Sequence, residues 1–225
     1  LSLLHHGSSG ISETELSKLL NGKTNLSELK QVYSLLNQGV IKSTNGFFVR
    51  SDLPLNETYR SDVKDIMLVS SEDFKNPGPV VQKINNFIEV GTGGLIRGFI
   101  NESAITPLSY AILINTIYLK AKWSKPFEKF STHSMPFNGL QGRSQVQMMF
   151  SERTIPYYED SSLQMIELNY QENDMSMIVV LPRSGARIDA NHMMGLFSYL
   201  GSDKVEVYLP KFTQRKRIDL SSAVR

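Results

Sequence analysis

The stretch from Leu108 to Phe130 constrains the fold more than any other part of this sequence. Between Leu108 and Trp123 it contains no Gly or Pro, and β-branched and aromatic residues are frequent, which predicts a β-strand. Apolar residues occupy both alternating faces, with Leu113, Ile117 and Leu119 on one and Ile112, Ile114 and Tyr118 on the other. A strand that is apolar on both faces is covered on both sides, so we expect it in the interior of a sheet.

Two residues of this stretch stand out from its apolar pattern. Asn115 interrupts the apolar row, and an unpaired buried amide costs about 1–3 kcal/mol. Its side chain should therefore form hydrogen bonds to neighbouring strands. Trp123, the only tryptophan of the chain, is expected to be a core aromatic residue.

Helical and strand patterns alternate before residue 100. Ser12 and Glu15 have the spacing of a capping box and predict a helix start there. The buried stripe of this helix is expected at Leu16, Leu19 and Leu20. Further helices are predicted at residues 26–38, which follow Asn25, at 56–66, and from residue 77 to a glycine-rich end at 91–94. Strands are predicted at residues 40–49 and 67–70.

After Phe137 the sequence is typical of antiparallel β-structure. Strands are predicted at residues 144–150, 163–170, 175–181 and 205–209, and a helical segment at 189–200. Polar turns are expected at 140–143 and 171–174. Helices that alternate with strands, followed by a β-rich part, indicate an α+β fold.

The stretch from Asn115 to Phe137 resembles the third strand of the large sheet in the serpin family. The matching positions are Asn115, Tyr118, Lys120, Trp123, Pro126, Phe127, Thr132 and Phe137. Leu119 and Ala121 depart from the usual Phe and Gly. Four more segments agree in the order of the family, namely residues 84–96, 146–149, 175–182 and 207–212. The resemblance covers nearly the whole chain.

The resemblance implies a serpin-type α+β fold with a large mixed β-sheet, helices packed on it and a β-rich C-terminal part. It implies a single domain over residues 1–225 that is incomplete at both ends, without the first helices and the reactive-loop region. In the family one strand passes through Asn45-Gly46, although this dipeptide alone would predict a hairpin turn. The helix at residues 77–91 is expected to lie across the large sheet.

The resemblance also assigns structural roles. It implies that Asn115 belongs to a hydrogen-bonded cluster beneath strands that part, and that Trp123 lies where a loop first enters the sheet. The sheet-opening and loop-entry positions carried over from the family are Asn115, Tyr118, Lys120, Trp123, Phe127 and Thr132. No catalytic residue is expected, and the reactive site lies outside this chain.

The function that the resemblance implies is inhibition of a serine, or cysteine, protease. The protease cleaves an exposed bait loop, remains attached as an acyl intermediate, and is distorted when the loop inserts into the large sheet. The alternative is a non-inhibitory serpin that acts as a carrier, chaperone or interaction protein. An enzyme is not expected.

Composition argues against several other classes of function. The net charge of +2 does not indicate a nucleic-acid or membrane partner, and we expect a monomer. His5, His6, His133 and His192 are scattered without metal-ligand spacing, so neither metal nor cofactor is predicted. The glycines at 91–94 close a helix, so they do not form a phosphate-binding loop.

Two kinds of surface motif bear on the compartment of the protein and on its contact with polysaccharides. Asn25, Asn56 and Asn101 begin glycosylation acceptor motifs, which have meaning in a secreted, extracellular protein; an intracellular serpin is the alternative. The basic residues Lys211, Arg215, Lys216 and Arg217 form one dense cluster. This cluster is either a contact for a sulfated polysaccharide or a solvated strand end. The helix at residues 26–38 carries only Lys30, so it is not basic.

Overall fold

The computed structural model describes residues 1–225 except 107, 140–141, 172–174, 184–188 and 214–225. The chain divides into two compact units, Leu1–Lys120 and Ala121–Arg225, and each is described by itself. The predicted turns at 140–143 and 171–174 lie partly outside the described residues. That the whole chain forms a single domain stays a prediction.

The first unit contains a three-stranded sheet in the order β2-β1-β3. β1 (Ile41–Arg50) pairs parallel with β2 (Leu68–Glu72) and antiparallel with β3 (Ala111–Leu119), so the sheet is mixed, as predicted. The helical elements of this unit are α1 (Ser2–His6), α2 (Gly10–Leu19), α3 (Leu26–Asn37), α4 (Glu57–Val63), α5 (Pro77–Gly91) and η1 (Glu102–Ala104).

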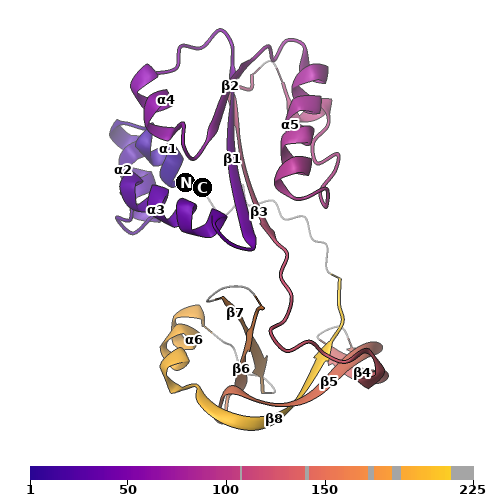
Figure 1. The fold of residues 1–225 in the computed structure, drawn as a ribbon. Coiled ribbons are helices and arrows are strands. Elements are labelled where there is room, and N and C mark those ends of the chain that lie inside the picture. The colour runs from indigo at the N-terminus through magenta and orange to yellow at the C-terminus, as the bar shows by residue number, and fades with distance from the viewer. Residues whose placement is uncertain (107, 140–141, 172–174, 184–188, 214–225) are drawn as a thin grey trace. The chain divides into compact units, whose positions relative to one another are not determined.

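Helices cover both faces of this sheet. Figure 1 shows α1 to α4 on one side of the strands and α5 on the other. On the α5 side, Phe48 of β1 and Ile84 of α5 are fully buried, and Ile112 and Ile114 of β3 pack against them. The opposite face forms a second core that contains Leu3, Val63, Ile66 and Met67, with Phe47 and Leu113 packed against it. Neighbouring residues of one strand thus serve two different cores.

Local chemistry explains where three of the helices begin. Asn25 caps α3, since its side chain accepts hydrogen bonds from the backbone of Ser27 and Glu28, and Asn56 caps α4 in the same way. Pro77 occupies the first turn of α5, where no backbone donor is needed. These three helices were predicted close to their observed bounds.

The prediction for α2 was wrong in two respects. The helix begins at Gly10 after Ser9, ahead of the predicted cap at Ser12, and no side chain caps it. The leucine stripe is not buried, since no residue of α2 is buried and Leu19 is 54% exposed. Capping motifs indicate where a helix can begin, but burial of its stripe depends on a packing partner that the sequence of the helix does not specify.

Gly46 lies inside β1, and the chain passes through it as a single strand, as the resemblance implied. A Cβ atom at this position would lie 2.8 Å from the Phe48 ring and 3.0 Å from the Phe87 ring of α5. Glycine is therefore required for the close approach of the helix, not for a turn. This explains why a hairpin signal occurs within a continuous strand.

The second unit contains a five-stranded antiparallel sheet. Its path is β4-β5-β6-β7, and β8 pairs with β5. The elements are η2 (Lys129–Ser131), β4 (Thr132–Gly139), β5 (Gly142–Glu159), β6 (Leu163–Asn169), β7 (Ser176–Pro182), α6 (Ala190–Leu196), η3 (Phe197–Tyr199) and β8 (Gly201–Pro210).

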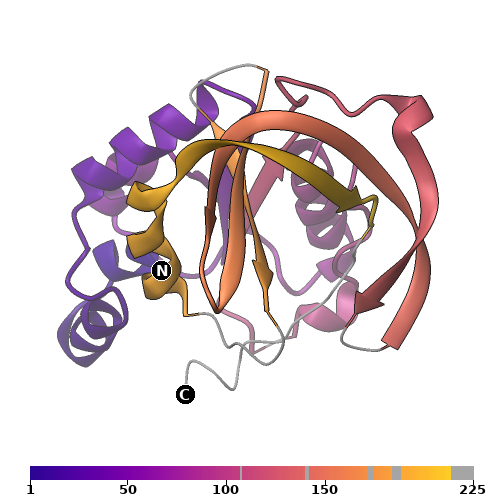
Figure 2. The same cartoon turned by 90° about the horizontal axis from the view of Figure 1, so that it is seen from below.

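The long, curved β5 organises this second unit (Figure 2). It pairs with β4 at its beginning, with β8 from Met148 to Tyr157, and with β6 at its end. The prediction ended this strand at Phe150, because the polar residues that follow lack an alternating apolar pattern. Backbone pairing with β8 nevertheless extends β5 to Glu159. The separate strand β4 was not predicted from its residues.

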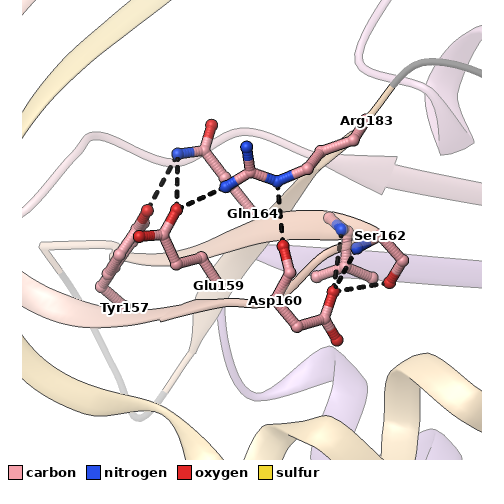
Figure 3. Close-up of polar contacts among 7 residues, drawn as sticks. Tyr157, Glu159, Asp160, Ser162, Gln164 and Arg183 are labelled. Atoms are coloured by element: carbon pink, nitrogen blue, oxygen red, sulfur yellow. Dashed lines mark hydrogen bonds and ion pairs between the residues drawn. The ribbon is translucent and has the colours of Figure 1, made fainter.

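Polar contacts join the turn between β5 and β6 to the end of β7 (Figure 3). The Asp160 carboxylate accepts hydrogen bonds from the Ser162 hydroxyl at 2.6 Å and from the Ser162 and Leu163 backbone at 2.7 and 3.0 Å. These bonds, above all that from the Ser162 hydroxyl, lower the pKa of Asp160 to about 2. Arg183 pairs with Glu159 at 2.6 Å and donates to the Asp160 carbonyl at 2.9 Å.

Replacing Gly91 with Ala is expected to destabilise the first unit. A Cβ atom there would lie 2.6 Å from both the Thr44 and the Thr116 hydroxyl oxygens, so we expect a loss of about 1–3 kcal/mol in denaturant unfolding of the full-length protein. Thr44→Ala with Thr116→Ala should relieve the loss. As a control, Gly195→Ala in α6 has open space and should stabilise by about 0.5–1 kcal/mol. Equal effects at Gly91 and Gly195 would contradict the close contact.

The second prediction concerns the carboxyl group of Asp160. Because the pKa of Asp160 in the folded protein lies below its ordinary value of 3.8, its hydrogen bonds contribute stability above pH 3.8, and this stability is lost as the pH falls through about 2. Ser162→Ala should raise this pKa toward 3.8, measured by carboxylate NMR titration. Ser161→Ala is the control, since no described hydrogen bond joins Ser161 to this carboxylate. An unchanged pKa in Ser162→Ala would refute the assignment.

Candidate functional site

β3 is the strand to which the resemblance assigns the central role. Among the described residues it pairs with β1 only, so these residues do not contain the second neighbour that the prediction of an interior strand requires. The apolar pattern on both faces arises because α5 covers one face and the α1–α4 side covers the other. Such a pattern reports how the faces of a strand are covered, not whether it has lateral neighbours.

The second half of β3 is more exposed than the first. Ile112, Leu113 and Ile114 pack against the two cores, whereas Ile117 is 66% exposed and Leu119 is 42% exposed. An open edge with exposed apolar side chains is a template for the addition of another strand, because it offers unpaired backbone groups and apolar contacts together.

A chain of amide hydrogen bonds crosses from β3 through β1 to the turn before β2. The Asn115 side chain donates to the Asn45 side-chain oxygen at 2.9 Å, and the Asn45 amide donates to the Ile66 carbonyl at 2.9 Å. The predicted hydrogen bond from Asn115 to a neighbouring strand is therefore confirmed. The predicted burial of Asn115 is not, since this residue is exposed. These bonds stabilise β3 from its inner side only.

α5 lies directly on the paired strands β1 and β3. Thr44 and Thr116, which are opposite each other in the ladder, form a hydroxyl–hydroxyl hydrogen bond of 2.6 Å. Gly91, the last residue of α5, lies above this pair without room for a Cβ atom. This observed position agrees with the expectation that the helix at residues 77–91 lies across the sheet.

Two further carried-over positions lie at the end of the first unit. The Tyr118 ring lies against Gly93, just beyond α5. The Lys120 backbone N–H donates to the Val40 carbonyl at 3.3 Å, and its side chain is exposed. Tyr118, like Asn115, is a residue of β3. Lys120 follows β3 and adds one backbone hydrogen bond to the residue before β1.

The remaining three positions lie in the second unit. Trp123 forms an isolated bridge with Tyr170, and the two rings stack with centroids 5.0 Å apart. Phe127 lies beneath the Arg153 guanidinium, whose carbon is 4.2 Å from the ring centroid. Thr132 begins β4 and is paired with Met149. The structure thus places these residues in a different unit from Asn115. Trp123 is half-buried, not fully buried as a core residue would be, and its loop-entry role stays a prediction.

Arg153 was missed in the sequence. It is only 8% exposed, and burial lowers its pKa. Its Nη1 donates to the Lys125 carbonyl at 3.0 Å and its Nε to the Ser151 hydroxyl at 3.1 Å, whereas its Nη2 has no hydrogen-bond partner among the described residues. No local signal marked this position, because its neighbours Glu152 and Thr154 are also polar.

The surface motifs are only partly within the described residues. Asn25, Asn56 and Asn101 are all exposed, and glycosylation at them stays a prediction. Lys211 is exposed, but Arg215, Lys216 and Arg217 lie outside the described residues. The described residues contain no group of three or more His, Cys, Asp or Glu arranged to hold a metal ion. They also contain no helix that is both long and apolar enough for a membrane span.

Similar sequences identify the family. A sequence model of the family Serpin (serine protease inhibitor) matches residues 1–225. An uncharacterized serpin-like protein of Acanthamoeba polyphaga mimivirus is 32% identical over 97% of this chain and 58% of its own length. Serine protease inhibitor 42Dd of Drosophila melanogaster is 30% identical over 82% of the chain and 52% of its own length. The chain spans about half the length of these curated relatives.

Solved structures agree on the fold. A cleaved serpin 42Da has a TM-score of 0.90 at 22% identity and is matched over 99% of this chain and 65% of its own. Native protease nexin-1, solved with heparin, has a TM-score of 0.90 at 22% identity, and the match covers 99% of this chain and 66% of that one. Thyroxine-binding globulin complexed with thyroxine-fluorescein has a TM-score of 0.87 at 23% identity, and the match covers 99% of this chain and 72% of that one. These structures share the fold of the chain, and the family model over residues 1–225 together with the 32% identity to the mimivirus protein shows that the chain belongs to the serpin family.

Proposed function

We propose that the full-length protein containing this chain inhibits a serine, or cysteine, protease by acting as a suicide substrate. The observation that carries the proposal is the β1–β3 ladder beneath α5, the strand pair beside which the resemblance places the opening of the sheet. A cleaved bait loop would enter beside β3 as an additional strand. Membership of a family named for serine protease inhibition and similarity to serine protease inhibitor 42Dd support the same function.

The geometry around β3 suits such an insertion. An incoming strand gains main-chain hydrogen bonds along Ala111–Leu119 and covers the exposed side chains of Ile117 and Leu119. The Asn115–Asn45 bond stabilises β3 from the opposite edge, so the outer edge can accept a partner without loss of that contact. The distortion of the attached protease is driven by the stability gained in this step.

The alternative is a non-inhibitory serpin that serves as a carrier, chaperone or interaction protein. The similarity to thyroxine-binding globulin, solved with a thyroxine derivative, favours this alternative because that protein binds a small molecule on the same fold. Both functions are compatible with the described residues, and neither requires a catalytic group.

Incubation of the full-length protein with a panel of serine and cysteine proteases distinguishes the two functions. We expect a covalent complex with at least one protease that survives boiling in denaturant, because the acyl bond persists after insertion. A protease whose nucleophile has been replaced by alanine is the control and should form no such complex. Cleavage of the protein by every protease that acts on it, without complex formation, would refute inhibition and favour the alternative.

We further propose that the protein is a secreted, extracellular monomer, glycosylated at one or more of Asn25, Asn56 and Asn101, and that it contacts a sulfated polysaccharide. The exposure of all three asparagines is compatible with glycosylation. The similarity to protease nexin-1, solved with heparin, supports a polysaccharide contact, and Lys211 with the basic residues after it is the candidate surface.

Heparin-agarose chromatography of the full-length protein tests the polysaccharide contact. We expect retention that is weakened by salt and lost when Arg215, Lys216 and Arg217 are replaced by alanine, since each removes a positive charge. The double variant Lys18→Ala, Lys23→Ala, which removes exposed charges elsewhere, is the control and should still be retained. Failure of the wild type to bind would leave the cluster as a solvated strand end.

A further inference from the structure

The segment that leads from α5 to η1, residues 92–101, is the longest described stretch of the first unit without a helix or strand. We call it the α5–η1 loop. Three of its glycines have left-handed backbone conformations, with φ values of 58° at Gly93, 81° at Gly94 and 56° at Gly98. Exposed loops that contain small residues are preferred sites of proteolysis in folded proteins. The α5–η1 loop is therefore a candidate for limited proteolysis.

The side chains at the centre of this loop are exposed. Leu95 is 72% exposed, and the side chain of Arg97 is exposed to the same extent. The Arg97 guanidinium pairs with Glu89 of α5 at 3.0 Å and donates to the Gly94 carbonyl at 3.2 Å. An ion pair between such exposed groups contributes little to stability, so a protein partner can replace it. The guanidinium is therefore accessible.

The loop is held mainly at its two ends. The Thr92 hydroxyl donates to the Ile88 carbonyl at 2.7 Å and accepts from the Ile96 backbone N–H at 3.1 Å. The Asn85 side chain accepts from the Ile100 backbone N–H at 3.0 Å and donates to the Ile100 carbonyl at 2.9 Å. Only a few hydrogen bonds must break for the middle of the loop to open while α5 and β3 stay in place.

Trypsin-like serine proteases bind an arginine side chain in a pocket that contains a carboxylate, and they bind the substrate backbone in an extended conformation. Arg97 supplies such a side chain. Gly98, which follows it, can change from a left-handed to an extended conformation because it has no Cβ atom. We propose that the bond between Arg97 and Gly98 is a cleavage site for a trypsin-like serine protease in the folded protein. This site is separate from the bait loop of the proposed function.

Cleavage at this site is a hydrolysis. The C–N bond between Arg97 and Gly98 breaks, water supplies a hydroxyl group to the Arg97 carbonyl carbon, and the Gly98 nitrogen takes the hydrogen. The break lies between α5 and β3, so β1 and β3 belong to different fragments. Since a continuous ladder pairs β1 with β3, the two fragments should stay associated after cleavage.

Limited digestion of the full-length protein with trypsin tests this proposal. Trypsin is added in molar excess, so that free protease remains even if some of it forms the covalent complex of the proposed function. We expect mass spectrometry to show a fragment that begins at Gly98 before fragments that begin at Thr24 or Asn76, which follow exposed lysines in shorter loops. The fragments on the two sides of the break should elute together from a size-exclusion column and separate in denaturant.

Three variants locate the cleavage. Arg97→Gln should slow the formation of the Gly98 fragment at least about tenfold, because the carboxylate of the protease pocket then has no cation to bind. Arg97→Lys should still be cleaved, and Lys75→Gln, which removes an exposed charge from another loop, should leave the rate unchanged.

Two outcomes would overturn the proposal. One is that no Gly98 fragment forms from the wild type before general degradation, and the other is that Arg97→Gln is cut at this bond as fast as the wild type. The first outcome uses only the wild type, so it decides even if a variant does not fold. The covalent complex is measured separately on a denaturing gel, so failure of the proposed inhibition leaves this test unaffected.

Discussion

The antiparallel pairing of β1 with β3 is the interaction on which the first unit depends. It runs from Ile41 opposite Leu119 to Val49 opposite Ala111. Because side chains alternate along both strands, this single ladder supplies one core beneath α5 and another beneath α1 to α4. Loss of the pairing would expose both cores at once, whereas loss of any one helix would expose only one.

Sequence reasoning succeeded where a residue acts through its immediate neighbours. The caps at Asn25 and Asn56 and the proline at the start of α5 were predictable because their effects are local. The continuity of β1 through Gly46 came from family resemblance, since local chemistry indicated a turn. The number of strands that flank β3 could not be predicted from its residues, because its apolar pattern depends on the helices that cover its two faces.

Some features of the candidate site could also be predicted from the sequence, and others could not. A hydrogen-bond partner for Asn115 was predictable, because an isolated amide in an apolar strand needs one, but its identity as Asn45 depends on strand register. Gly91 and Arg153 were missed, since their importance arises from close approach to residues far away in the sequence.

The contact of Gly91 with the two threonines has a consequence for folding. A slip of one residue in the β1–β3 ladder would turn Thr44 or Thr116 to the other face and bring one of its sequence neighbours toward the helix, which are Ser43 and Asn45 in β1 and Asn115 and Ile117 in β3. Asn45, Asn115 and Ile117 are larger than the threonines that already leave no room for a methyl group on Gly91. Docking of α5 therefore disfavours three of these four misaligned arrangements relative to the native one.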